Sequence, residues 1–213
     1  MSQVAYHWWW RPGWLVGRRF YTVHATFADI PAVQDLAAKA RDRLAGLPGL
    51  DLIPGQWLHL TMQGIGFADE VSDADLSAII TAAQARLAVV SPVTVAIGPP
   101  VVAGEGVTCW ASPPRALDPV RDAVRAGIAD VWGLGGVPEA NDWSAHVSVA
   151  YASADGPGEP IQAALGGLAD VAEAAIGAVD LIRLGRDDRL YEWETITSLP
   201  LSGTHDNQQA HLV

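Results

Sequence analysis

Hydrophobic and polar positions alternate with a period of two in some segments of the chain and with a helical period in others. In the first half, the pattern predicts a strand at 20–27, a helix at 31–44, a strand at 57–62, a helix at 73–89 and strands at 93–97 and 107–111. In the second half, it predicts a helix at 117–132, a strand at 145–151, a helix at 161–172 and strands at 179–184 and 190–198. The second half thus resembles the first in the order of its elements.

The two halves are related by a constant offset in the sequence. His59 and His146 are 87 residues apart, and both fall on predicted strands. The same offset carries Pro31, Asp73, Val93 and Thr108 to Asp118, Pro160, Asp180 and Thr195. Each of these positions falls in, or at the start of, the matching kind of element. A repeat of this length in two copies indicates a duplicated lobe with a pseudo-two-fold axis and a cleft between the copies.

These observations predict an α+β protein with two pseudo-symmetric lobes, antiparallel-rich sheets that line a central cleft, and helices on the outside. We divide the chain into a Trp-rich N-terminal segment at 1–17, a single bilobal domain at 18–203 and a flexible tail at 204–213. The length of 213 residues and the 50% hydrophobic content suffice for a substantial core.

Charge and cysteine content narrow the classes of function. The chain has 13 Lys and Arg against 24 Asp and Glu, and this net charge of −11 disfavours binding to long nucleic acid. A small anionic substrate in a local basic pocket remains compatible with it. The single Cys109 cannot form an internal disulfide or anchor a zinc site, so we expect no metal, no cofactor and a reducing cytoplasm. We also expect a monomer without a targeting signal or a membrane span.

Two predicted strands each carry a histidine with a hydroxyl residue two positions later. His59 and Thr61 share one face of their strand, and His146 and Ser148 share one face of theirs, because side chains alternate along a strand. The opposite faces carry apolar residues, namely Leu58, Leu60 and Met62 in the first strand and Ala145, Val147 and Val149 in the second. The polar faces are therefore expected to line the cleft.

The motifs His59-Leu60-Thr61 and His146-Val147-Ser148 resemble the signature of the 2H phosphoesterase superfamily, which includes bacterial 2′-5′ RNA ligases and cyclic phosphodiesterases of RNA ends. One His-x-Thr/Ser motif is a weak pattern, but two copies in register with an internal repeat are much more specific. The resemblance extends from about Arg18 to Leu201. It implies that a 2′,3′-cyclic phosphate opens to a phosphomonoester, with His146 preferred as the base and His59 as the acid, although the near symmetry leaves this assignment open.

The chemistry explains why these residue types recur. Cleavage of a phosphodiester needs a base that deprotonates water and an acid that protonates the leaving oxygen, and imidazole titrates near neutrality. Thr61 and Ser148 can donate hydrogen bonds to the phosphate oxygens, where charge grows in the transition state, in place of a metal ion. We therefore predict His59, His146, Thr61 and Ser148 as catalytic residues.

Four further residues are candidates for contact with substrate. His24 belongs to a third His-x-Thr motif, but the position 87 residues later is Ala111, so His24 is either a cleft-lining residue or a core residue. Arg18 could hold a phosphate, although charges at the start of a strand are usually solvated. Tyr191 lies in the closing stretch that resembles the final strand of the family, and Trp143 completes the set. For the Trp-rich segment we prefer hydrophobic packing over a role as a lid.

Three alternatives to cyclic phosphodiester hydrolysis remain open. The first is 2′-5′ RNA ligation by the same histidines, which the acidic composition disfavours. The second is hydrolysis of a non-nucleotide phosphoester. The third is a non-catalytic protein that binds a nucleotide or phosphate, against which the two intact His and hydroxyl pairs argue.

Overall fold

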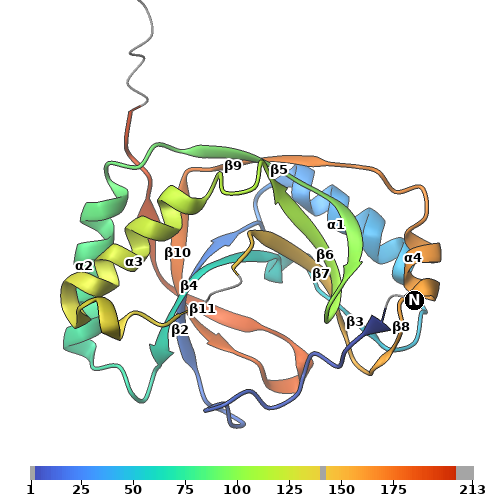
Figure 1. Cartoon of the computed structure of the whole chain (residues 1–213), viewed down its shortest axis with the longest axis horizontal. Helices are drawn as coiled ribbons and strands as arrows, with labels where there is room; N and C mark the ends of the chain where they lie inside the picture. Colours follow the sequence, from blue (N-terminus) through green and yellow to red (C-terminus); the bar gives the residue numbers. More distant parts are fainter. Residues whose placement is uncertain (1–2, 140–142, 205–213) are drawn as a thin grey trace, which may run out of the picture.

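The computed structural model describes residues 3–139 and 143–204 (Figure 1). The helices are α1 (Pro31–Leu44), α2 (Asp73–Leu87), α3 (Asp118–Trp132) and α4 (Glu159–Leu165). The strands are β1 (Gln3–Val4), β2 (Phe20–Thr26), β3 (Leu50–Leu52), β4 (His59–Phe67), β5 (Val93–Ala103), β6 (Gly106–Ser112), β7 (His146–Ala152), β8 (Gly156–Pro157), β9 (Ala172–Ile176), β10 (Ala178–Gly185) and β11 (Glu192–Pro200). Most of these elements match the periodicity of the sequence.

Two antiparallel sheets form the centre of the molecule. One has the strand order β11-β10-β2-β4, and the other has the order β3-β7-β6-β5-β9. Read from the motif strands outward, β4-β2-β10-β11 in the first sheet corresponds to β7-β6-β5-β9 in the second. The offset of 87 agrees with this correspondence for β4 and β7 and for β5 and β10, but Thr108 and Thr195 lie on β6 and β11, which do not correspond.

The helices cover the outer faces of the sheets. Helices α2 and α3 pack on each other and contact β4 and β11 of the four-stranded sheet, whereas α1 and α4 contact the five-stranded sheet. Figure 1 shows the two helix pairs at opposite sides of the molecule, with the strands between them. The predicted α+β class, with antiparallel sheets inside and helices outside, is confirmed.

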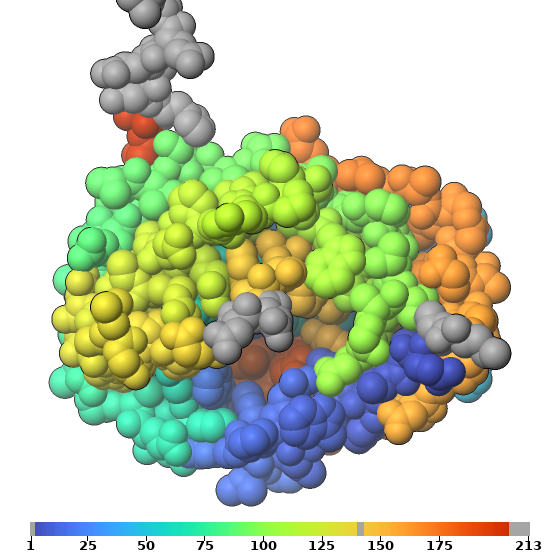
Figure 2. All heavy atoms as spheres, viewed as in Figure 1, coloured from blue at the N-terminus to red at the C-terminus, as the bar shows by residue number. Residues whose placement is uncertain are grey.

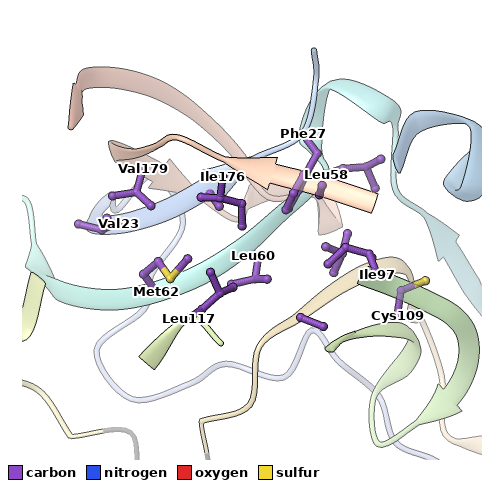
Figure 3. Packing of buried hydrophobic residues seen from close by; sticks show 14 of the residues in the cluster. Val23, Phe27, Leu58, Leu60, Met62, Ile97, Cys109, Leu117, Ile176 and Val179 are labelled. Carbon is purple, nitrogen blue, oxygen red and sulfur yellow. The ribbon is translucent and has the colours of Figure 1, made fainter. Parts of the chain in front are cut away.

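Buried side chains of the motif strands join the sheets to these helices. Leu58, directly before β4, and Leu60 and Met62 within it are completely buried. Figure 3 shows them in the core with Leu117, the residue before α3. Because apolar residues occupy alternate positions of β4, burial of this face turns His59 and Thr61 toward the other side of the sheet.

The structure corrects the helix predicted at 161–172, which is shorter than expected and is followed by a strand that was not predicted. Helix α4 ends at Leu165, and the chain leaves the helix at Gly166 and Gly167, where Gly167 has a φ of 78°. Residues Ala172–Ile176 form β9, which pairs with β5 and alternates buried and exposed side chains. Alanine and glutamate favour helices in isolation, but here the pairing with β5 overrides that preference. The predicted strand at 57–62 also begins later, because Gly55–Trp57 is a turn of 3₁₀ helix.

The N-terminal segment contacts both sheets, and its later part packs through Trp14 on Phe20 and Phe67 of the four-stranded sheet. Strand β1 pairs antiparallel with β8, and the indole of the buried Trp8 donates a hydrogen bond to Asp51 at 2.9 Å. Trp9 and Trp10 are exposed. Of the predicted tail, residues 205–213 lie outside the described part of the chain.

Candidate active site

A cavity of about 570 Å³ lies between the two sheets, where Figure 2 shows the surface hollowed near the middle of the molecule. The four residues that the sequence predicts as catalytic all line it. Among the residues that the structure describes, the lining consists of His7, Arg11, His59, Thr61, Ala103, Gly104, Glu105, Gly106, Thr108, Trp110, His146, Ser148, Tyr151 and Tyr191. The fold thus brings both His-x-Thr/Ser motifs to one cavity.

Strand pairing gives the two motifs equivalent neighbours. On β2, His24 lies opposite Thr61 of β4. On β6, Thr108 lies opposite Ser148 of β7. The structural counterpart of His24 is therefore Thr108 and not Ala111, the position indicated by the offset of 87, because 40 residues separate Thr108 from Ser148 and only 37 separate His24 from Thr61. His24 has no histidine counterpart in either numbering.

Both motif histidines are oriented in the same way. The Nδ1 atom of His59 lies 2.8 Å from the carbonyl oxygen of Trp57, and Nδ1 of His146 lies 2.7 Å from that of Ser144. A carbonyl oxygen only accepts hydrogen bonds, so each Nδ1 carries the proton and donates it. Each neutral ring then has an unprotonated Nε2 that a substrate or water can use. This shared geometry follows from the same local contact two residues before each histidine.

The surroundings of His59 disfavour its charged form. Burial lowers the pKa of His59 to about 4, and the nearby His146 lowers it further, while the hydrogen bond to Trp57 opposes the shift. The ring of His24 stacks on His59 with centroids 4.5 Å apart, and Trp193 meets the ring of His59 edge-on at 5.3 Å. His59 is therefore neutral at pH 7 in the unliganded protein.

His24 lies behind the cavity wall rather than in the lining. It is 1% exposed, and its Nε2 lies 3.2 Å from Oγ1 of Thr61. Burial lowers the pKa of His24 well below its usual value, and the proximity of His59 contributes. The sequence left open whether His24 lines the cleft or belongs to the core. In the structure Thr61 and His59 line the cavity and His24 does not, so His24 belongs to the core.

Tyr191 lines the cavity as part of an aromatic cluster. Its hydroxyl lies 3.1 Å from Nε2 of His7, and the ring of His7 stacks on Tyr151 at 3.9 Å. Burial raises the pKa of Tyr151, an effect that its hydrogen bond with Ser148 opposes. Ser148 therefore has Tyr151 as a neighbour, as Thr61 has His24.

Arg18 and Trp143 lie outside the cavity lining. Arg18 forms ion pairs with Asp69 at 2.9 Å and Glu70 at 2.5 Å, and its guanidinium lies over Phe67. The guanidinium of Arg18, which was expected to bind a phosphate, is thus already paired with two carboxylates. The indole of Trp143 donates a hydrogen bond to the backbone oxygen of Thr61 at 2.8 Å, so Trp143 contacts the motif strand from the side.

Sequence reasoning missed a polar cluster at one end of the cavity. Glu105, in the turn between β5 and β6, accepts hydrogen bonds from Arg11 at 2.6 Å and from His7 at 2.7 Å. Burial lowers the pKa of His7 to about 4, although Glu105 opposes this shift. These residues are more than 90 positions apart, so no local pattern connects them. Only the charge of Arg11, directly after three tryptophans, marked the segment as unusual.

The described residues lack two kinds of feature, namely clusters of metal-ligating side chains and helices able to span a membrane. Within 3–139 and 143–204, no group of three His, Cys, Asp or Glu side chains is arranged to hold a metal ion. Among the same residues, no helix combines the length and apolar character that crossing a membrane requires.

Comparisons with known proteins agree with the fold. The crystal structure of TT0787 of Thermus thermophilus has a TM-score of 0.65 and 17% identity, with 88% of this chain and 100% of that chain covered. E. coli LigT complexed with 3′-AMP has a TM-score of 0.60 and 13% identity over 87% and 98% of the two chains. The MHV ns2 PDE domain has a TM-score of 0.53 and 11% identity over 78% and 99%. No curated protein sequence matches the chain.

The match of a family model, together with the two-sheet fold and the paired motifs, identifies the class as the 2H phosphoesterase superfamily. The model of the 2′-5′ RNA ligase superfamily matches residues 18–188, and the chain belongs to this superfamily. The matched region begins after the segment that carries His7 and Arg11.

Proposed function

We propose that the protein is a metal-independent cyclic phosphodiesterase that hydrolyses the 2′,3′-cyclic phosphates of RNA ends or of small nucleotides. The carrying observation is that two histidines with the same fixed tautomer, each beside a hydroxyl residue, line one cavity from two sheets. LigT, which shares the fold, has been solved with 3′-AMP and with phosphate, and this supports a small nucleotide as ligand here.

In the proposed reaction, one histidine takes a proton from water through its unprotonated Nε2. The water oxygen forms a bond to phosphorus, and the bond from phosphorus to the 2′ or 3′ ribose oxygen breaks. The second histidine, protonated at Nε2, donates a proton to that leaving oxygen. One water is consumed, and a phosphomonoester with a free hydroxyl results. Thr61 and Ser148 donate hydrogen bonds to the two non-bridging oxygens.

The low pKa of His59 bears on the roles of the histidines. A base must begin the reaction neutral, and an acid must begin it protonated. Because burial lowers the pKa of His59 to about 4, we propose His59 as the base and His146 as the acid, the reverse of the assignment preferred from sequence. A bound phosphate would favour protonation of either ring, since opposite charges attract.

The test is hydrolysis of the four nucleoside 2′,3′-cyclic monophosphates in EDTA, with the product identified by ³¹P NMR. His59→Ala and His146→Ala should each lower kcat by roughly 10²- to 10⁴-fold. Lys39→Ala, which removes only an exposed ion pair with Asp170, is the control and should match wild type. A wild-type protein that needs a divalent metal, or alanine variants that remain fully active, would contradict the proposal.

Assays with other substrates and ligands separate the alternatives. In ligation a 5′-hydroxyl of RNA takes the place of water and attacks the cyclic phosphate, so ligation would appear as joining of an RNA 2′,3′-cyclic phosphate to a 5′-hydroxyl end. Turnover of other phosphoesters with no turnover of cyclic nucleotides would indicate a non-nucleotide substrate. Binding of 3′-AMP with no turnover of any phosphoester would indicate a binding protein.

A further inference from the structure

Between the catalytic wall and the core lies a histidine that the proposed reaction does not use. His24 on β2 contacts both members of the first motif, because its ring stacks on His59 with an interplanar angle of 5° and its Nε2 lies 3.2 Å from Oγ1 of Thr61. Its other ring nitrogen, Nδ1, is buried and has no hydrogen-bond partner within the described part of the chain. A contact of this kind can determine which way the hydroxyl of Thr61 points.

The charge state of His24 is the first step of the argument. The side chain is 1% exposed, and no carboxylate is bonded to either ring nitrogen in the described residues. An unpaired imidazolium would be costly at such a site, so the ring is neutral and carries a single N–H. Two tautomers are then possible, and they have opposite consequences for Thr61.

In the first tautomer, the proton is on Nδ1. A buried N–H group would then have no acceptor, which is rare in folded proteins. Nε2 would be an acceptor, and it would take the only hydroxyl hydrogen of Thr61. Thr61 could then only accept hydrogen bonds from the cavity, and phosphate oxygens at neutral pH are acceptors as well.

In the second tautomer, the proton is on Nε2 and is donated to Oγ1 of Thr61. The unpaired group is then only a lone pair on Nδ1, which costs less than an orphaned N–H. Because Oγ1 accepts from His24, the hydroxyl hydrogen of Thr61 is free to point into the cavity that Thr61 lines. This arrangement leaves Thr61 able to donate to a phosphate oxygen.

We propose that His24 is a positioning residue that donates from Nε2 to Thr61 and thereby makes the Thr61 hydroxyl a donor toward a bound phosphate. The inference rests on the proposed function for its catalytic consequence, but the tautomer itself is independent of activity. His24 has the opposite tautomer to His59 and His146, whose Nδ1 atoms donate to carbonyl oxygens.

The deciding measurement is long-range ¹H–¹⁵N NMR on protein labelled with ¹⁵N-histidine at pH 7. The signals that disappear in His24→Phe identify the residue. We expect a proton on Nε2 of His24 and on Nδ1 of His59 and His146. A proton on Nδ1 of His24, or a charged His24 ring, overturns the inference even if the enzyme is active.

Steady-state kinetics provide a second test of the role of His24. His24→Phe keeps a buried planar ring against His59 and removes the donor, and we expect kcat to fall roughly 10- to 100-fold with a smaller change in KM. His24→Gln, whose amide nitrogen can replace Nε2, should recover part of the loss. In a Thr61→Val background, His24→Phe should cost less than about twofold, because the hydroxyl it orients is gone. An equal loss in both backgrounds overturns the positioning role.

Thr22→Val is the matched control on the same strand. Thr22 is buried and bonds to the backbone oxygen of Gln63, so the variant disturbs β2 without contact with Thr61. It should lower the melting temperature but leave kcat within about twofold. If wild type hydrolyses no cyclic phosphate, the proposed function fails, and NMR still decides the tautomer of His24.

Discussion

The guanidinium of Arg11 and the carboxylate of Glu105 lie 2.6 Å apart and join the N-terminal segment to the turn between β5 and β6. The same carboxylate accepts hydrogen bonds from His7 and from the indole of Trp9 at 3.1 Å. Three side chains of one segment thus converge on a single acceptor at the cavity. The family model matches residues 18–188, so the three donors of this wall lie outside the matched region and the acceptor Glu105 lies inside it.

Glu105→Gln should loosen this wall. A neutral amide cannot pair with Arg11 as strongly as a carboxylate does, so we expect KM to rise about 3- to 10-fold while kcat changes less. Stability should fall by about 1–2 kcal/mol, because the lost bonds are only partly buried. Steady-state kinetics and urea denaturation measure the two effects.

Glu70→Gln serves as the control for that experiment. Glu70 is an exposed partner of Arg18 outside the cavity, and its removal should change stability by less than about 0.5 kcal/mol and leave KM unaltered. If Glu105→Gln behaves as Glu70→Gln does, the segment has no part in substrate binding.

Loss of either motif hydroxyl should reduce the rate rather than the affinity. Thr61→Val and Ser148→Ala each remove a donor to a developing phosphate charge, so we expect kcat to fall roughly 10- to 10³-fold. Thr61→Ser retains the hydroxyl and should stay within about fivefold of wild type. Comparable kcat values for Thr61→Val and Thr61→Ser would show that the hydroxyl is not used.

Local periodicity predicted what depends on local geometry. The helix at 31–44 begins and ends as α1 does, and the alternation around His59 and His146 correctly separated the cavity face from the core face. Both results follow because burial of every second residue in a strand determines where the others point. The catalytic roles of these residues stay predictions.

Local periodicity could not predict contacts between side chains that are far apart in the sequence. Arg18 meets Asp69 and Glu70, which lie about fifty positions later, and Glu105 meets Arg11, which lies 94 positions earlier. No spacing in the sequence marks such partners, because they become neighbours only when the strands pair. For the same reason the strand at 172–176 was not predicted, since it exists only beside β5.

Cys109 should be unreactive in the folded protein. Its thiol is buried, and burial raises the pKa of Cys109 to about 12, so almost no thiolate is present at pH 8. Treatment with N-ethylmaleimide should leave the native mass unchanged and add one adduct in urea. Rapid modification without denaturant would indicate that β6 opens readily.

Three histidines should make the fold sensitive to mild acid. Burial lowers the pKa of His59 and of His7 to about 4 and that of His24 well below its usual value. In the unfolded chain all three have a pKa near 6.5, so between about pH 6.5 and pH 4 the unfolded state binds protons that the folded state does not. The free energy of unfolding is therefore unaffected by these histidines above about pH 6.5 and decreases as the pH falls below that value.

The loss should approach about 1.4 kcal/mol per pH unit for each histidine, before carboxylates with their own lowered pKa begin to titrate. Urea denaturation at pH 7, 6 and 5 measures this slope. His24→Phe removes one of the three groups and should flatten the slope by about one proton, because phenylalanine binds none in either state. An unchanged slope in that variant would mean that His24 is charged in the folded protein, and a charged ring could not leave a lone pair on Nδ1.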